Sequence, residues 1–434
     1  MKYFPHIRGI RRDADERYRK RCSEAFTPFE PIDLPEFFAG RDRHIERFRE
    51  ELAAPGRQVA IFGERGVGKT SFAKLAYDFV GNREDVHFVS CQKTSSFESI
   101  FIDVLDSAGV GTIPGGVEAQ EVREGKGRVP LIEVTWSQAR TAIHRPLSTG
   151  QVRPPFLLKQ FGERPGMIVI DEYDKVADIN TQTQVTELMK YFSDEGSKTK
   201  IILVGVADTL SQLIGKHEPV GRSLAKIKLD RMSDAELNNI IKRGQDHLPA
   251  VFESSVRDRI VRLADGFPYF VHLVCLCASR AAAKQLVTGP RVRVPTVRYP
   301  EYAEGLREAL TKAQHRLSEQ YEEAVVTTRG PNVKLALVLW GMALAQDLHS
   351  PIRDIARNAA ALANDDVKTE SLNQALGELS TDHCAKILTK VRKGYYRFTD
   401  PLMRPYIRAI VEQQSLVGTG SKKPATVEAE LTQV

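Results

Sequence analysis

The sequence predicts an α/β fold in which helices flank a parallel β-sheet, followed by a helical segment and a C-terminal unit of helices with a β-hairpin. Short apolar runs at residues 59–62, 86–91, 167–171 and 201–205 are typical of buried strands. Helical patterns alternate with these runs, which favours a parallel sheet covered on both faces. A glycine-rich loop follows the first run, at the strand end where such sheets bind ligands.

The loop spans residues 63–70, Gly-Glu-Arg-Gly-Val-Gly-Lys-Thr, and fits the phosphate-loop pattern G-x-x-x-x-G-K-[ST]. Its backbone N–H groups would cradle the phosphates, Lys69 would reach the β- and γ-phosphates, and Thr70 would ligate Mg²⁺. The alternative is a glycine-rich turn without function, which the flanking strand and helix disfavour. We therefore predict a P-loop NTPase core with ATP and Mg²⁺ as cofactors. The predicted nucleotide-binding residues of the loop are Gly63, Gly66, Val67, Gly68, Lys69, Thr70 and Ser71.

Two carboxylates, Asp171 and Glu172, end the apolar run that starts at residue 167. Asp171 can hold Mg²⁺ through water, as a second metal-binding residue beside Thr70. Glu172 can polarise the attacking water as a catalytic residue. The alternative is a pair of surface carboxylates at a strand end.

Two further catalytic candidates follow the strand pattern 201–205. Asp208 is placed to touch the γ-phosphate or the water, and a helix cap is an equally good interpretation. Arg222 is either an arginine finger that a neighbouring copy supplies in trans or an ordinary surface arginine.

Composition is that of a globular chain of two or three domains, since 434 residues divide into roughly 150 per domain. Hydrophobic content is 42% and charged content 27%. No apolar run approaches the ~18 residues that span a membrane, and the N-terminus shows no signal core. Five scattered cysteines form no disulfide or metal pattern, so we expect a cytoplasmic protein. A net charge of +6 permits contact with nucleic acid without demanding it.

The pattern along the chain predicts five segments. A capping box, Ser233 with Glu236, starts the helical part, and residues 109–165 are either partly helical or a functional insertion within the core. The segments are a basic arm and linker (1–35), the ATPase core (36–231), a helical lid (232–328), a winged-helix domain (329–412) and a disordered tail (413–434).

These motifs together resemble AAA+ ATPases of the origin-recognition initiator branch and the related STAND signal-transduction ATPases. The phosphate loop and Asp171-Glu172 match Walker A and Walker B, and residues 203–208 occupy the sensor 1 strand. Residues 38–46 resemble the "GRExE" opening of the group, which implies that Arg41 lies near the adenine. Residues 221–237 are similar to the finger region and the start of the lid.

The tripeptide Gly266-Phe267-Pro268 resembles the G-x-P motif of the STAND lid, which implies that Pro268 approaches the nucleotide base. The resemblance covers about residues 30–411. Initiators usually carry Asn at sensor 1 and an arginine at sensor 2, whereas this chain has Asp208 and the Gly-Phe-Pro tripeptide. These departures favour the STAND side or a bacterial branch between the two groups.

The expected third helix of the winged helix, residues 369–379, contains two glutamates and no Lys or Arg. This composition disfavours base readout. DNA contact would instead use the tip of the hairpin or the basic N-terminal arm, and the alternative is a domain that packs on the core and reports its nucleotide state. The basic residues in question are Lys390, Arg392 and Lys393 at the tip and Arg8, Arg11, Arg12, Arg17, Arg19, Lys20 and Arg21 in the arm.

The resemblance implies an ATPase that forms a homo-oligomer with nucleotide and acts as a switch on a partner protein, with bacterial defence or a mobile element as one setting. A DNA-loading or DNA-remodelling ATPase and a nucleotide-binding scaffold with little turnover are the alternatives.

Overall fold

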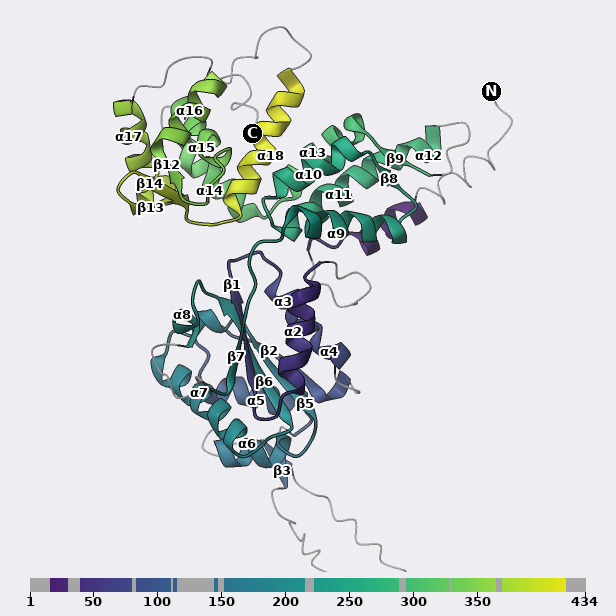
Figure 1. Cartoon of the computed structure of the whole chain (residues 1–434), viewed down its shortest axis with the longest axis vertical. Coiled ribbons are helices and arrows are strands. Elements are labelled where there is room, and N and C mark those ends of the chain that lie inside the picture. The colour runs from purple at the N-terminus through teal and green to yellow at the C-terminus, as the bar shows by residue number, and fades with distance from the viewer. Residues whose placement is uncertain are drawn as a thin grey trace, which may run out of the picture. The chain divides into compact units, whose positions relative to one another are not determined.

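The computed structural model describes residues 16–29, 40–79, 83–110, 112–114, 144–146, 152–214, 222–288, 294–327, 330–363 and 369–418. The chain divides into two compact units, each described here by itself (Figure 1). The first unit contains Met1–Ile45, Gly63–Leu75 and Leu229–Val434, and the second contains Glu46–Phe62 and Ala76–Lys228. The boundaries of the five predicted segments stay predictions. The two units divide the chain at other positions, because the residues of the phosphate loop belong to the same unit as the C-terminal part.

The second unit is built on a five-stranded sheet in the order β2-β5-β6-β1-β7. β2 pairs with β5, β5 with β6, and β1 with β7, each in parallel. At the start of β1, the side-chain oxygen of Gln58 accepts a hydrogen bond of 2.6 Å from the N–H of Ile201 near the start of β6. These two strands therefore begin at the same edge. The strands are β1 (Gln58–Gly63), β2 (Val86–Ser90), β5 (Gly166–Asp171), β6 (Thr199–Val206) and β7 (Leu224–Lys228).

Helices cover this sheet because alternate strand residues are apolar on both faces. Ile168 and Ile170 of β5 join one core with residues of α5, α6 and α7, while Val169 is equally buried on the other face. Side-chain caps at Ser96 and Asp178 start α5 and α7. The helices are α2 (Asp42–Ala53, which begins in the first unit), α4 (Ala76–Phe79), α5 (Phe97–Ser107), α6 (Pro154–Phe161), α7 (Ile179–Asp194) and α8 (Leu210–Ile214), with short 3₁₀ helices η2 (Arg83–Asp85) and η4 (Tyr173–Lys175).

The segment predicted as a partly helical stretch or an insertion, 109–165, is helical over α6. Leu157 and Phe161 of α6, with Val152 before it, belong to the core of the second unit. Two short strands, β3 (Thr112–Pro114) and β4 (His144–Pro146), pair antiparallel. The remainder of this stretch, residues 115–143 and 147–151, lies outside the described residues.

The middle of the first unit is a group of helices in which α11 packs against α9, α10 and α13. The predicted capping box at Ser233 and Glu236 is confirmed at the start of α9. Within the segment predicted as helical, one helix ends at Lys312 and the next begins at His315. The elements are α9 (Asp234–His247), β8 (Val251–Phe252), α10 (Ser254–Ala264), α11 (Pro268–Ala282), α12 (Lys284–Thr288), β9 (Thr296–Val297), α13 (Tyr299–Lys312) and α14 (His315–Val325).

The C-terminal part of the first unit contains three helices, a small antiparallel sheet in the order β12-β14-β13, and a long last helix. β13 and β14 form the predicted hairpin, which turns at Lys393 and Gly394. The elements are β10 (Val326–Thr327), β11 (Gly330–Pro331), α15 (Val333–Ala343), β12 (Ser350–Pro351), α16 (Ile352–Ala363), α17 (Thr369–Glu378), η5 (Asp382–Cys384), β13 (Leu388–Arg392), β14 (Tyr395–Phe398) and α18 (Met403–Gly418).

Within the predicted basic arm, residues 16–25 form a helix whose basic face is exposed and whose other face is buried. Phe26, just after it, is fully buried, packs edge-to-face on Phe252, and leaves no room for a side chain at Gly244. At the other end, α18 continues to Gly418, so residues 413–418 of the predicted disordered tail are helical, because no Gly or Pro lies between Pro405 in its first turn and Gly418.

Of the basic arm residues, Arg17, Lys20 and Arg21 lie exposed on this first helix, with Arg19 partly exposed beside them. Arg8, Arg11 and Arg12 lie outside the described residues. Over the described ranges, none of the helices has the length and apolar character needed to cross a bilayer.

Candidate functional site

The phosphate loop follows β1 and leads into α3 (Lys69–Lys74), as predicted. Gly63, Gly66 and Gly68 have φ values of 154°, 85° and 91°, which side chains rarely adopt. A Cβ at Gly63 would overlap the carbonyl oxygen of Leu229. The three glycines are thus required by conformation, and at Gly63 by close backbone approach as well.

Lys69 and its neighbours lie at the start of α3. Lys69 is 8% exposed, and its Nζ donates a hydrogen bond of 2.7 Å to the carbonyl oxygen of Glu64, which keeps the ammonium inside the loop. Thr70 and Ser71 follow in the first turn of α3, and Val67 is fully buried. The side chain that would bind phosphate and the one that would ligate Mg²⁺ are therefore adjacent on one short element.

Arg41 is buried and forms hydrogen bonds with the backbone of the phosphate loop and of the chain after β7. Its guanidinium donates 2.9 Å and 2.6 Å hydrogen bonds to the carbonyl oxygens of Val67 and Asp230. Its own N–H donates to the carboxylate of Glu236. Burial lowers the pKa of Arg41 from its ordinary value, against the pull of Glu236 and Asp230. The structure thus gives Arg41 the role of fixing the loop backbone, and its expected place near the adenine stays a prediction.

The Gly266-Phe267-Pro268 tripeptide also meets the loop. A Cβ at Gly68 would lie 3.8 Å from Cγ of Pro268, so the proline borders the loop. The ring of Phe267 lies under the guanidinium of Arg231, 4.5 Å from its carbon, and the carbonyl of Gly266 accepts from the N–H of Met232. Each of the three residues therefore contacts the loop or the chain that follows β7.

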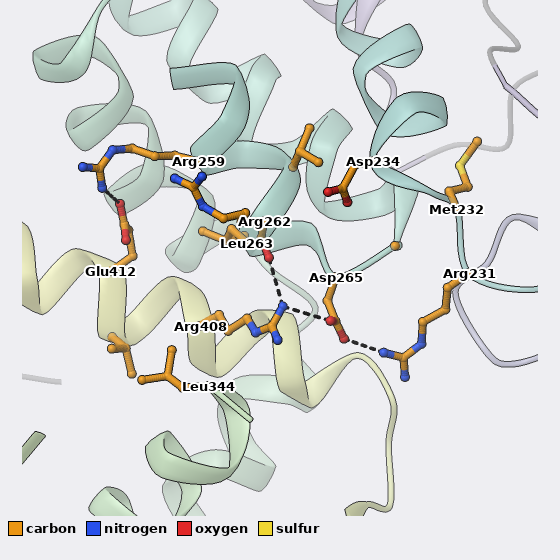
Figure 2. A pocket seen from close by; sticks show the side chains of 13 residues that line it. Arg231, Met232, Asp234, Arg259, Arg262, Leu263, Asp265, Leu344, Arg408 and Glu412 are labelled. Carbon is orange, nitrogen blue, oxygen red and sulfur yellow. Dashed lines mark hydrogen bonds and ion pairs between the residues drawn. The ribbon is translucent and has the colours of Figure 1, made fainter. Parts of the chain in front are cut away.

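An arginine network connects the loop to the C-terminal part of the first unit. Arg231 donates to Glu64 of the loop (2.7 Å) and to Asp265 at the end of α10. Asp265 also accepts from Arg408 of α18 (2.9 Å), and Nε of Arg404 lies 3.8 Å from it. Figure 2 shows Arg231 and Arg408 on either side of the Asp265 carboxylate. Three guanidiniums thus share one carboxylate.

The C-terminal part reaches the loop directly as well. A Cβ at Gly66 would lie 2.6 Å from Cδ2 of Leu402, which is 1% exposed. Beside this contact, a cavity of about 60 Å³ is lined by Glu64, Arg231, His349, Arg397 and Arg404, among others. Burial lowers the pKa of Arg404 to about 10, with Asp265 opposing the shift, and burial also lowers that of Arg408. The surroundings of the loop on this side are therefore rich in positive charge.

Asp171 and Glu172 belong to the second unit. Asp171 ends β5, is 6% exposed, and its Oδ1 accepts from the N–H of Glu172 (2.8 Å). Glu172, just after the strand, has a φ of 54°, and its Oε2 accepts from Ser90 (2.9 Å) and Lys175 (2.6 Å). Each carboxylate thus accepts hydrogen bonds at the point where the chain leaves the sheet.

Asp208 and Arg222 lie at opposite ends of the second unit's strands. Asp208 is exposed just after β6, and Gln212 accepts from its N–H (2.8 Å). Arg222 is exposed before β7, and its carbonyl accepts from Arg57, which precedes β1. Within the second unit, Arg222 therefore lies at the edge of the sheet where β1 and β7 begin.

The residues present fit ATP with Mg²⁺. The loop supplies glycines with positive φ and an enclosed lysine, and β5, whose end carries Asp171, lies two strands from β1 in the sheet order. Among the described residues, no cluster of three or more His, Cys, Asp or Glu side chains could hold a metal alone. A magnesium ion would therefore depend on nucleotide phosphates for part of its coordination, and the predicted roles of Thr70 and Asp171 stay predictions.

Several residues around the loop were not predicted as part of the site. Asp265, Leu402, Arg404 and Arg408 come from segments far from the loop in sequence, and no local pattern distinguishes them. Arg231 lies within the stretch 221–237 that resembles the finger region, which was the only available signal for it.

Residues 55–214 match the family model of the AAA domain. Among solved structures, the chain is similar to a Walker-type ATPase of Pyrococcus abyssi, with 14% identity, 88% and 99% of the two chains covered and a TM-score of 0.49. It is similar to the ORC1 protein of Aeropyrum pernix in complex with DNA, with 16% identity, 91% and 97% covered and a TM-score of 0.41. A third is the RuvB Holliday junction branch migration motor of Thermotoga maritima, with 14% identity, 85% and 95% covered and a TM-score of 0.40. Similarities of this size carry no functional argument, and a comparison with curated proteins found no match.

Proposed function

We propose that this AAA-domain chain is an ATP-dependent molecular switch that assembles with nucleotide and controls a partner protein. One observation carries the proposal: the phosphate loop contacts both the helical segment and the C-terminal part within one compact unit, through Gly68 with Pro268, Gly66 with Leu402, and Glu64 with Arg231. A loop held in this way cannot change its shape without affecting these neighbours.

In this proposal the predicted residues divide the ATPase chemistry among them. The loop binds the phosphates, Thr70 and Asp171 hold Mg²⁺, and Glu172 orients the attacking water. Mg²⁺, when bound, neutralises charge that develops on the phosphates. The bonds from Ser90 and Lys175 to Glu172 support an oriented carboxylate. Asp208 is assigned either to the γ-phosphate or to the local turn before α8.

We assign residues 232–328 as the lid and 329–412 as a winged helix. The element order of the latter supports this, since three helices precede a β-hairpin to which β12 adds a strand, and a helix closes the unit. Packing of α18 against α10, α13 and α15 supports a lid and winged helix that move together.

We assign Arg222 as an arginine finger for a neighbouring copy. Its exposure before β7 supports a role in trans, because a neighbouring copy can reach an exposed side chain. A homo-oligomer is then needed for full turnover.

DNA remodelling is the second candidate function, favoured by one observation. Lys390, Arg392 and Lys393 are exposed at and beside the hairpin turn. Binding to duplex DNA that weakens steeply with salt would support this function, and an absence of binding at low salt with ATP present would exclude it.

Nucleotide binding by Lys69→Ala tests the site itself. We expect loss of at least about 100-fold in ATP affinity, because the enclosed ammonium is the loop's strongest phosphate ligand. Unchanged affinity would refute the assignment. Size measurement with and without a slowly hydrolysed ATP analogue tests the assembly, and an identical mass in both states would refute nucleotide-dependent oligomerisation.

A further inference from the structure

A second cavity, of about 510 Å³, lies in the first unit between α10, the start of α9, the end of α15 and α18 (Figure 2). Its volume is within the range of small-molecule sites, roughly 300–1,000 Å³. Its lining includes no residue of the phosphate loop. Whatever binds there would therefore bind apart from ATP.

The charged side chains of this cavity do not cancel. Four arginines and three acids line it. Arg259 pairs with Glu412 at 2.5 Å, and Arg231 and Arg408 pair with Asp265. The third acid, Asp234, lies in the first turn of α9, where the helix dipole stabilises its charge.

The fourth arginine, Arg262, has no acidic partner in the cavity. Among the residues that the structure describes, no hydrogen bond or ion pair joins its guanidinium, and the residue is exposed. Figure 2 shows it on the same wall as Arg259 and Leu263. A guanidinium presents a fork of donors that matches a carboxylate or a phosphate.

Apolar side chains also line the cavity. Leu344, at the end of α15, is 42% exposed although most of α15 is buried, and Val411 of α18 is part of the lining as well. Figure 2 places Leu344 on the side of the cavity away from Arg262. The cavity thus combines an unpaired guanidinium, which favours an oxyanion, with apolar side chains, which favour an apolar surface.

We propose that this cavity is a second ligand site, which binds a small organic oxyanion with an apolar body. Arg262 forms the ion pair, and Leu344 and Val411 pack against the apolar part. Such a ligand would join α10 to α18.

Isothermal titration with 1-naphthyl phosphate, 1-naphthoate and neutral 1-naphthol tests the proposal on the full chain. The first two probes distinguish phosphate from carboxylate as the preferred group, and the third removes the charge. We expect the preferred anion to bind at least about tenfold more tightly than 1-naphthol, as a charge-assisted pair requires. Equal binding of charged and neutral probes, or no binding of either anion, would overturn the proposal.

Arg262→Gln should weaken the preferred anion about tenfold and leave 1-naphthol unchanged. Since Arg262 is exposed, this variant should fold normally. Arg307→Gln, an exposed arginine of α13 outside the cavity, is the matched control and should bind like the wild type. An Arg262→Gln variant that binds the anion as the wild type does would show that the site is elsewhere.

Lys69→Ala separates this proposal from the proposed function. The cavity predicts that this variant loses ATP but keeps the naphthyl probe. Loss of both would place the probe on the phosphate loop and refute the second site. Retention of ATP would instead refute the nucleotide site and leave the cavity result standing.

Discussion

The replacement Asp265→Asn tests the link between the phosphate loop and the C-terminal part. In the structure, Asp265 accepts from Arg231 and Arg408, and Arg404 lies 3.8 Å away. Asparagine keeps the shape of the side chain but removes the charge. The three guanidiniums then lose their shared carboxylate while staying close to one another.

The expected magnitude follows from burial. Removing one partner of a buried ion pair destabilises by about 3–5 kcal/mol. The side chain of Asp265 is 14% exposed, and those of Arg231, Arg404 and Arg408 are 17%, 4% and 18% exposed. Partial screening lowers the expected loss to about 2–4 kcal/mol. Because about 1.4 kcal/mol is a factor of ten, the docking equilibrium of α18 should shift by about 30- to 1,000-fold.

The assay is the release rate of a fluorescent ADP analogue, measured together with urea unfolding. If packing of the C-terminal part keeps the phosphate loop in the conformation that binds nucleotide, release of the ADP analogue should accelerate by up to the same factor as the docking equilibrium shifts. Asp258→Asn, an exposed carboxylate on the same helix, is the control and should change stability by less than about 0.5 kcal/mol. Release and unfolding of Asp265→Asn that match the wild type would refute the reasoning.

Three further predictions follow from the site and the core. Glu172→Gln should keep ATP affinity and lower turnover by at least about 100-fold, in single-turnover assays with and without DNA; equal turnover would remove Glu172 from the chemistry. Arg222→Ala should lower turnover without changing ATP affinity of the monomer, and wild-type turnover per protomer should rise with protein concentration; a concentration-independent rate would contradict a finger in trans. Burial lowers the pKa of His272 to about 4, below the ordinary value of about 6.5. The unfolded chain then binds more protons between these values, so the unfolding free energy should fall by up to about 3 kcal/mol as the pH drops from 6.5 to 4. His272→Gln should flatten this dependence and the exposed-site variant His247→Gln should not, as pH-dependent unfolding curves would show.

Local patterns were sufficient to predict the sheet and the loop. Apolar runs alternate with helical patterns whether or not distant contacts are known, and the glycines of the loop reflect its own backbone conformation. The capping box at Ser233 was equally local. These features depend on residues close together in the chain, so a single sequence displays them.

The arginine network around the phosphate loop could not be predicted, because its members are far apart in the chain. Arg231 lies 167 positions from Glu64 and Arg408 lies 143 positions from Asp265, and arginines and acids are common on any surface. Nothing in the sequence distinguishes the arginines and acids that form ion pairs in the folded protein from the others. The role of Arg41 in holding the carbonyl of Val67 was missed likewise, although its position beside the site was expected from the resemblance.

The first helix, residues 16–25, has a consequence for the order of folding. Thr27, just after it, donates its N–H to His272, 245 positions later in the chain. At about 5–20 residues per second, synthesis of the intervening chain takes roughly 10–50 s. During that time the N–H of Thr27 lacks His272, and Phe26 can pack only once Gly244 and Phe252 have been made. The helical segment that borders the phosphate loop can therefore complete its core only after the chain has been made beyond α11, which places the closure of the nucleotide site late in biogenesis.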